Sequence, residues 1–235
     1  MSTVRIIIIG NEILSGKFVD ENTPYLIQEC KKRDLHIEEI TIIQDDVETI
    51  ARHVKHASKK STYVITTGGV GPTHDDLTMK GIAKAFDTEL IESPELLTLI
   101  TTHIGDNPGA RRMALVPKNY TLWDCGPKLF PQVVVENVFI FPGIPKLMKR
   151  KFEAIVQHWK GEHTIRKQIH LNTYESDIAV ELERLQRKHP KVEIGSYPRY
   201  HEAPITLIIT IDGKDQVAVA ESAADIRRIF SQYLV

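Results

Sequence analysis

Short apolar segments alternate with longer amphipathic ones along the first part of the chain. Residues 4–9 form a nearly continuous β-branched run that ends at Gly10, and such unbroken apolarity indicates a strand buried on both faces. Further strands are predicted over residues 37–43 and 63–67, and a helical pattern follows each strand. This alternation predicts an α/β fold with a mainly parallel sheet and helices on both faces.

Capping residues indicate where the predicted helices begin. Thr23 suits the N-cap and Pro24 the first position of a helix that ends near residue 34. One of Asp45 and Asp46 is expected to cap a helix over residues 47–59, which leaves the other free to face the sheet edge. Asp76 is expected to cap a helix that reaches residue 86, and another helix is predicted from Ser93-Pro94 to residue 105.

The remainder of the chain suggests a second domain. Residues 109–128 show no clear period, residues 133–135 and 138–141 predict paired strands, and a helix should reach residue 159. The pattern changes near Glu162, which divides the chain into residues 1–162 and a small α+β domain over residues 163–235. Strands over 165–171, 192–197 and 205–211 and helices over 176–188 and 218–233 are predicted there, and Asp212-Gly213 is expected to end the last strand.

Composition narrows the function classes. The hydrophobic content of 42%, the charged content of 26% and the net charge of −1 are ordinary for a globular protein and lack the basic excess of nucleic-acid binders. The apolar run near the N-terminus is too short for a signal peptide or a membrane span. Cys30 and Cys125 show no metal or redox spacing. We therefore expect a cytoplasmic protein with reduced thiols and neither a nucleic-acid nor a membrane partner.

The strongest motif is the glycine-rich turn Gly68-Gly69-Val70-Gly71, which lies between a predicted strand and a predicted helix. Glycine permits positive φ and a close approach of the backbone to a ligand, and successive N–H groups can bind an anion. Ligands of parallel sheets bind at the carboxyl ends of strands. A tight turn alone would also require glycine, so that alternative stays open. No Gly-Lys-Ser/Thr follows, so this is not a P-loop.

Carboxylates surround this turn in the sequence. Asp75 and Asp76 follow it closely, Asp45 follows the second strand, and Glu12 follows the first. Carboxylates repel a phosphate unless a cation such as Mg²⁺ lies between them, so a nucleotide-like ligand with a divalent ion is predicted. Glu12 is interpreted equally as a metal ligand, a base or a loop cap.

Weaker signals complete the candidate site. Pro142-Gly143 forms a second turn before a helix, which is either a tight connection or a further wall of the pocket. Arg111 and Arg112 either reach phosphates or form a solvated surface pair. His74 is the one histidine inside a motif, and no metal-triad spacing of histidines is present.

These motifs together resemble a known family. The strings GNEILSG, IIQDD, TTGGVGPTHDDLT and FPGIP are similar to the molybdopterin-binding-like (MoaB/Mog-type) domain. They match most closely the branch found in CinA-type competence-damage-inducible proteins and at the N-terminus of FAD synthase. The string GSYP resembles part of the small KH-like domain that follows in that branch. The resemblance implies a three-layer α/β fold, and it covers essentially the whole chain.

The resemblance also implies a chemistry and a set of residues. Asp45 and Asp76 match by motif position the two aspartates that serve adenylyl transfer, and the branch is associated with metal-dependent hydrolysis of nucleotide pyrophosphates such as FAD. The predicted ion is Mg²⁺, Mn²⁺ or Co²⁺, held by Asp76, Asp45 and Glu12, with Asp75 orienting water. A homo-oligomer is expected. The predicted ligand-binding residues are Gly10, Glu12, Gly68, Gly69, Gly71, Thr73, Thr78, Pro142 and Gly143.

Departures from the family leave three functions open. Asn11 stands where that branch carries an acidic residue, which removes one potential carboxylate. The synthase and amidase domains of the relatives are not in this sequence, so FAD synthesis by this chain alone is not expected. The leading hypothesis is a metal-dependent FAD-type pyrophosphatase. The alternatives are a molybdopterin-binding, adenylyl-transferring protein and a non-catalytic nucleotide-binding regulatory module. The KH-like segment lacks a GxxG loop, so nucleic-acid binding is not predicted.

Overall fold

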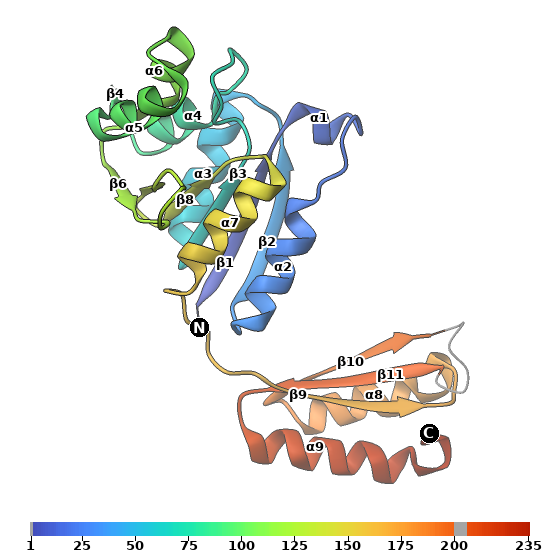
Figure 1. Cartoon of the computed structure of the whole chain (residues 1–235). Helices are drawn as coiled ribbons and strands as arrows, with labels where there is room; N and C mark the ends of the chain where they lie inside the picture. Colours follow the sequence, from blue (N-terminus) through green and yellow to red (C-terminus); the bar gives the residue numbers. More distant parts are fainter. Residues whose placement is uncertain (1, 200–205) are drawn as a thin grey trace. The chain divides into compact units, whose positions relative to one another are not determined.

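The computed structural model describes residues 2–199 and 206–235, which divide into two compact units, Met1–Gly161 and Glu162–Val235 (Figure 1). The strands of the first unit are β1 (Thr3–Ile9), β2 (His36–Ile43), β3 (Tyr63–Thr67), β4 (Leu90–Glu92), β5 (Leu115–Pro117), β6 (Tyr120–Trp123), β7 (Gln132–Val135) and β8 (Val138–Phe141). Its helices are α1 (Asn11–Leu14), α2 (Asn22–Lys32), α3 (Val47–Lys60), α4 (Thr78–Ala85), α5 (Pro94–Ile104), α6 (Pro108–Met113) and α7 (Pro145–Val156).

A six-stranded sheet of order β2-β1-β3-β8-β7-β6 forms the centre of the first unit. The first four strands in this order run parallel, whereas β7 pairs antiparallel with β8 and with β6. The predicted, mainly parallel α/β sheet is therefore confirmed. The predicted pairing of residues 133–135 with 138–141 is also present.

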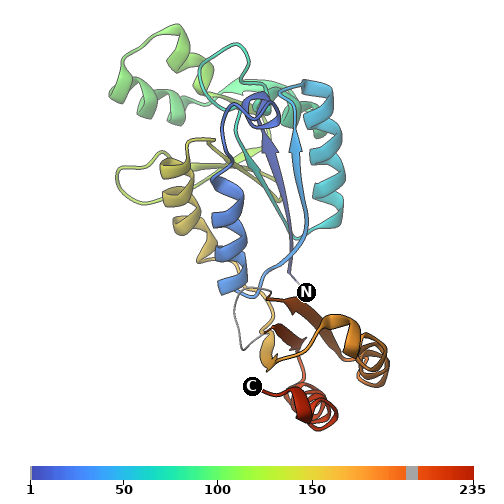
Figure 2. The ribbon, with the colours of Figure 1, turned by 90° about the vertical axis from the view of Figure 1, so that its right-hand side faces the viewer.

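The central strand β1 shows why the sheet needs helices on both faces. Ile7 and Ile9 pack with the core beneath α3, α4 and α5, whereas Ile6 and Ile8 pack with α2 and α7 on the opposite face. Figure 2 shows α2 and α7 on one side of the sheet and α3 on the other. This burial on both faces accounts for the unbroken apolar run in the sequence.

Two predicted N-caps are wrong, and each is explained by a competing hydrogen bond. Helix α2 begins at Asn22, one residue before the predicted cap Thr23, because the Asp20 carboxylate accepts from the backbone N–H groups of Asn22 and Thr23 at 2.9 and 3.1 Å. Asp76 does not cap α4, which begins at Thr78 after Leu77. The Asp76 carboxylate instead accepts from the N–H of Thr73.

The segment 109–128, predicted to be irregular, contains regular structure. Part of α6 lies there, followed by β5 and β6. Strand β5 pairs antiparallel with β4, and β6 pairs with β7 at the edge of the main sheet. These elements are too short to display a hydrophobic period of their own, so their pairing with distant strands determines them.

The second unit consists of a three-stranded antiparallel sheet and two long helices. Its elements are β9 (Ile165–Leu171), α8 (Glu175–Lys188), β10 (Val192–Pro198), β11 (Leu207–Gly213), α9 (Gln216–Ile229) and a final 3-10 turn (Ser231–Tyr233). The strand order is β10-β11-β9. The predicted small α+β fold is confirmed, although Asp212 and Gly213 still pair within β11, and the predicted strand start at Ile205 lies outside the described residues.

No helix among the described residues is long and apolar enough to cross a lipid bilayer. Both cysteines are buried and unpaired. Burial raises the pKa of the Cys30 thiol to about 12, which keeps that thiol protonated and unreactive near neutral pH.

Candidate functional site

The carboxyl ends of four parallel strands meet at one edge of the sheet. Ile9 of β1 is in register with Ile43 of β2, and Thr67 of β3 pairs with Ile8 and with Phe141 of β8. The turns that follow these strands are therefore neighbours, although they are far apart in the sequence. This is the edge at which the sequence predicts a ligand site.

Glycine at this edge allows backbone segments to pack directly against one another. Gly68 has a φ of 106°, and a Cβ atom there would lie 2.0 Å from the carbonyl oxygen of Ile9. A Cβ atom on Gly143 would lie 3.3 Å from the Cα atom of Gly68. The contact at Gly68 requires glycine, and the contact at Gly143 is tighter than most Cβ contacts, so the two glycine turns form one closely packed backbone floor.

Part of the predicted anion nest is already used by the protein. The N–H of Gly68 donates to the carbonyl oxygen of Phe141 at 3.2 Å, so this amide is not free for a ligand. Among the described residues, the N–H groups of Gly69, Val70 and Gly71 have no protein acceptor. The available nest is therefore the segment from Gly69 to Gly71, one residue shorter than predicted.

A cleft of about 660 Å³ lies along this floor. A smaller hollow of about 220 Å³, here called the side pocket, lies against the same loop and is bordered by Thr73, Lys80 and Arg112. The predicted residues that line the cleft are Glu12, Gly68, Gly69, Gly71, Asp76, Pro142 and Gly143. Thr73 lines the side pocket. The other predicted residues line neither cavity: Gly10, Asp45, Asp75 and Thr78.

Asp45 lies beside the cleft wall and is oriented by Asn11. The N–H of Asn11 donates to Asp45 Oδ2 at 2.8 Å, and the Asn11 side-chain oxygen accepts from the N–H of Asp45 at 3.4 Å. Burial is the main cause of the raised pKa of Asp45, and the charges of Glu12, Asp75 and Asp76 raise it further. The predicted carboxylates are thus close enough to interact electrostatically.

Asp76 is fixed by the residue at the start of its own turn. Asp76 Oδ2 accepts from both the backbone N–H and the hydroxyl of Thr73 at 2.7 and 2.5 Å. Its other oxygen, Oδ1, accepts no hydrogen bond within the described part of the chain, and the side chain lines both cavities. Asp75 is exposed, and a hydrogen bond from Thr73 is the main cause of its lowered pKa.

Thr78 and Gly10 support the site from behind. The buried Thr78 hydroxyl donates to the carbonyl oxygen of Gly68 at 2.7 Å, which holds the loop against α4. A Cβ atom on Gly10 would lie 2.7 Å from Glu12 Oε1, so the absence of a side chain there lets Glu12 fold back over the turn. Both residues shape the loop, whereas the sequence predicted them as ligand contacts.

The carboxylates do not form a complete metal cage. No group of three or more His, Cys, Asp or Glu side chains in residues 2–199 and 206–235 is arranged to hold a metal ion. A donor set of one or two carboxylates nonetheless fits an ion such as Mg²⁺, which usually takes its remaining ligands from water and substrate phosphates. The residues present therefore fit an ion shared with a phosphorylated ligand.

The predicted site residues do not include Asn22, whose side-chain amide is buried beside the cleft. Its Nδ2 donates to Thr67 Oγ1 at 3.1 Å and to the carbonyl oxygen of Gly143 at 2.8 Å. Thr67 Oγ1 in turn donates to the carbonyl oxygen of Pro142 at 2.9 Å. This network ties α2, β3 and the second glycine turn together. The signal in the sequence was the position of Asp20 and Asn22 shortly after the GNEILSG motif, at the predicted ligand edge.

An apolar rim around the cleft was also missed. Phe18, Val19 and Ile144 line the cleft and are 59%, 86% and 65% exposed. Exposed apolar side chains grouped at one cavity give this part of the cleft an apolar surface. The sequence places Phe18 and Val19 in a loop without any period, and nothing there predicts that they meet Ile144.

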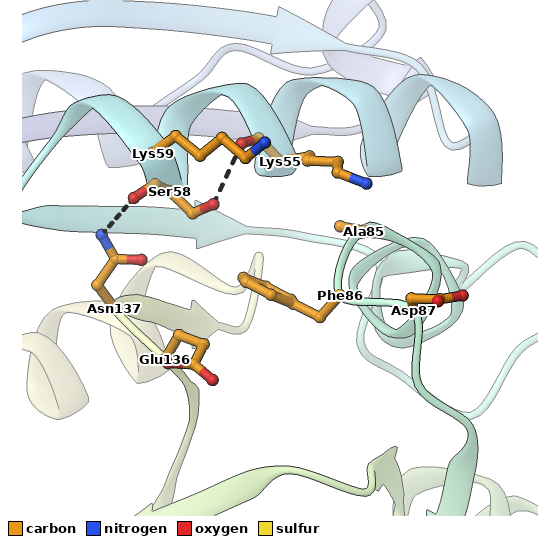
Figure 3. Close-up of a pocket in the computed structure, with 8 residues that line it drawn as sticks. All are labelled: Lys55, Ser58, Lys59, Ala85, Phe86, Asp87, Glu136 and Asn137. Carbon is orange, nitrogen blue, oxygen red and sulfur yellow. Dashed lines mark hydrogen bonds between the residues drawn. The ribbon is translucent and has the colours of Figure 1, made fainter.

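Another hollow lies elsewhere, bordered by the C-terminal parts of α3 and α4 and by the β7–β8 turn (Figure 3). Lys55, Phe86 and Asp87 border it, and the Asn137 amide beside it donates to the carbonyl oxygen of Ser58 at 3.0 Å. That bond fastens the β7–β8 turn to α3. None of the predicted site residues lies there, so the cleft is the candidate site.

Comparison with known proteins covers both units. Residues 5–160 match the family described as "Probable molybdopterin binding domain", and residues 163–235 match "FAD synthase, middle domain". A protein of Archaeoglobus fulgidus is 34% identical over 229 residues, which cover 96% of this chain and 97% of its own.

Other relatives are longer than this chain. A probable FAD synthase of Caenorhabditis elegans is 28% identical over 263 residues, covering 99% of this chain and 51% of its own length. A CinA-like protein of Picosynechococcus sp. is 35% identical over 170 residues, covering 67% of this chain and 41% of its own. The chain thus spans about half the length of the nematode relative.

A solved structure agrees with the fold of the first unit. The CinA protein of Thermoplasma acidophilum, described as having unknown function, superimposes with a TM-score of 0.61 at 28% identity. The match covers 66% of this chain and 98% of that one. Together these similarities confirm the resemblance to the molybdopterin-binding-like, CinA-type and FAD-synthase proteins that the motifs indicated.

Proposed function

The chain belongs over residues 5–160 to the molybdopterin-binding domain family, and from this premise we propose that it is a metal-dependent pyrophosphatase of FAD or a similar dinucleotide. One observation carries the proposal: the unbonded amides of the loop from Gly69 to Gly71 and the side chain of Asp76 share the wall of one cleft. The amides suit a phosphate, and the carboxylate suits a cation that neutralises it.

The apolar rim supports a ligand that carries a flat ring. Phe18 and Ile144 expose large apolar surfaces beside the phosphate-type wall. A nucleotide presents the same combination, because an aromatic base or flavin lies at one end and charged phosphates at the other. An aromatic ring bound against the apolar rim would place the pyrophosphate group beside the loop from Gly69 to Gly71. A dinucleotide therefore fits the cleft better than inorganic pyrophosphate does.

Asp76 and Glu12, which both line the cleft, would hold the divalent ion together with the phosphate oxygens, and the charge of Asp45 would act on it from beside the cleft wall. When bound, such an ion supplies Lewis-acid polarisation of the phosphoryl group and lowers the pKa of water. Burial is the main cause of the raised pKa of Asp45, and Glu12, Asp75 and Asp76 make smaller contributions, so an added cation would be stabilised by several carboxylates. Thr73 keeps Asp76 in one orientation, which leaves its Oδ1 free for a ligand.

The reaction needs a water molecule, and the chain's part is to position it and to stabilise charge. Water oxygen forms a bond to one phosphorus, and the bridging P–O bond breaks, so that FAD yields AMP and riboflavin phosphate. The amides of Gly69 to Gly71 stabilise the negative charge that develops on the phosphoryl oxygens. Asp75, kept ionised by its lowered pKa, is assigned to orient the water.

The test is release of AMP from FAD with Mg²⁺, Mn²⁺ or Co²⁺, compared between the wild-type protein and Asp76→Asn. We expect the variant to lose about a hundredfold or more of the turnover while it unfolds at the same temperature. Asp87→Asn is the matched control, because Asp87 borders the distant hollow of Figure 3. Equal rates in Asp76→Asn and the wild type would refute the role of Asp76.

Absence of AMP release by the wild type with each of these metals would refute the pyrophosphatase proposal itself. Titration with molybdopterin and with nucleotides would then separate the two alternatives. Tight molybdopterin binding with ATP-dependent adenylylation would support the cofactor-assembly function. Nucleotide binding without turnover would support a regulatory module.

A further inference from the structure

The two adjacent arginines of α6 have different surroundings. Arg111 Nη2 lies 2.6 Å from Asp106 Oδ2, and its Nη1 lies 3.6 Å from Glu92 Oε2, so two carboxylates neutralise this side chain. Arg112 Nη1 instead donates to the carbonyl oxygen of Pro72 at 2.7 Å, immediately after the glycine-rich loop. Arg111 is therefore the solvated surface residue of the pair, and Arg112 belongs to the site.

Arg112 borders the side pocket together with Lys80 of α4. Neither cation forms an ion pair with another residue in the described part of the chain. One Arg112 N–H group holds Pro72, which leaves the rest of the guanidinium fork available to an acceptor. Two cations without an ion-pair partner among the described residues border this pocket together with the carboxylate of Asp76, and this excess of positive charge favours an anionic ligand.

The side pocket shares a wall with the cleft. Gly69, Val70 and Gly71 line both cavities, and Asp76 does so too. A Cβ atom on Gly71 would lie 2.8 Å from Asp76 Oδ2, so the loop passes tightly over this carboxylate. The cleft side carries the apolar rim, whereas the side pocket carries the cations. The two cavities therefore adjoin at a loop whose amides have no acceptor in the described part of the chain.

We infer that Arg112 and Lys80 form a second phosphate subsite, which selects ligands with two linked phosphates over those with one. This inference rests on the proposed function of the cleft. One phosphate would bind to the amides from Gly69 to Gly71, and the second would bind to the guanidinium and ammonium groups at the adjoining side pocket. Arginine suits this task because its planar fork matches phosphate geometry.

The proposed subsite also accounts for how the negative charge of a diphosphate is neutralised. A diphosphate brings two or more negative charges towards Asp76, and a metal ion near that carboxylate offsets only part of them. Arg112 and Lys80 supply positive charge from the side pocket without competing for the metal ligands. A monophosphate bound at the amides has no second phosphate to place beside these cations, so it gains less from them.

The experiment is equilibrium titration of the full-length protein in the presence of Mg²⁺ with two probes, AMP and the non-hydrolysable α,β-methylene analogue of ADP. We expect the wild type to bind the diphosphate probe more tightly than AMP. Arg112→Ala should weaken binding of the diphosphate probe about tenfold, as for loss of one charge-assisted hydrogen bond, with AMP binding nearly unchanged. Arg112→Lys should recover part of the loss.

Arg111→Ala is the matched control, because it removes the same side chain from the same helix without touching the side pocket. We expect it to leave both affinities unchanged. A general loosening of the loop would weaken both probes equally in Arg112→Ala, and that result overturns the subsite. An unchanged preference in Arg112→Ala also overturns it while the proposed function stands. A wild type that binds neither probe refutes both.

Discussion

At the scale of single residues, two neighbouring aspartates have opposite electrostatic environments. Burial and nearby carboxylates raise the pKa of Asp45, whereas hydrogen bonds from Thr49 lower the pKa of Asp46. Asp46 accepts from the N–H of Thr49 at 2.8 Å and caps α3. Ionised Asp46 therefore stabilises the fold, whereas ionised Asp45 lowers its stability.

This contrast predicts opposite effects of two isosteric substitutions. Folding favours protonated Asp45, so its ionisation reduces stability as the pH rises above the ordinary value of 3.8 through its raised folded pKa. We therefore expect Asp45→Asn to raise the melting temperature at neutral pH in EDTA, and the gain should vanish towards pH 4. Thermal unfolding at a series of pH values measures both changes.

Asp46→Asn serves as the control, because we expect it to change the melting temperature in the opposite direction. Ionised Asp46 contributes stability above its ordinary pKa of 3.8, and this contribution is lost as the pH falls through its lowered folded pKa. We expect this variant to melt below the wild type at neutral pH, with a smaller difference in acid. If Asp45→Asn melts below the wild type at neutral pH, the inference that ionised Asp45 destabilises the fold is wrong.

The residue scale also separates what the sequence can predict from what it cannot. The glycine-rich turn, Asp45 and Asp76 were predicted because special backbone conformations and strand ends leave direct signals in the residue types. The cap role of Asp76 was wrong, because Thr73 offered both an N–H and a hydroxyl to its carboxylate. The sequence does not show which of several nearby polar groups will form a hydrogen bond with a given carboxylate.

At the scale of elements, the site depends on the contact between the ends of β1 and β3. Gly68 has positive φ and lies against the backbone of Ile9. Gly16 also has positive φ, at 71°, but nothing lies within 4 Å of the place where its Cβ atom would be. Both glycines therefore have a positive φ, but only Gly68 lies in close contact with other backbone atoms.

We expect Gly68→Ala to destabilise the protein by about 3 kcal/mol or more, because a strained φ is combined with a clash against backbone that must shift. We expect Gly16→Ala to destabilise the protein by only about 1 kcal/mol, because its φ is strained but its new Cβ atom meets no other atom. Chemical denaturation of both variants measures the two free energies of unfolding. Equal losses in the two variants would show that the close approach of β3 to β1 is not what requires glycine.

The main strands and helices were predicted because their hydrophobic periods are long enough to be recognised. Strand β1 has buried positions on both faces, and α3 has a continuous apolar side. Strands β5 and β6 were missed because they contain three and four residues, respectively. Such strands exist through pairing with β4 and β7, and this pairing is a property of the assembled sheet.

At the scale of the whole molecule, each unit has its own core. Buried side chains of the first unit form two clusters, one on each face of its sheet, and those of the second unit form a third. Every residue assigned to the cleft or the side pocket belongs to the first unit.

We therefore expect a fragment of residues 1–161 to fold cooperatively and to keep kcat/KM within about threefold of the full chain, since independent cores favour independent folding. Thermal unfolding checks the fold of the fragment, and AMP release from FAD checks its activity. The fragment carrying Asp76→Asn is the control for background hydrolysis. A well-folded fragment with activity reduced to that background would assign the second unit a part in turnover.

The loop from Gly69 to Gly71 has a further consequence because it lines both the cleft and the side pocket. Two of its three residues have no side chain, so an added side chain at either glycine would narrow both cavities at once. Under the proposed function, this one loop therefore sets the spacing between the two phosphate subsites. A ligand would then be selected by the length of its phosphate linkage as well as by its base.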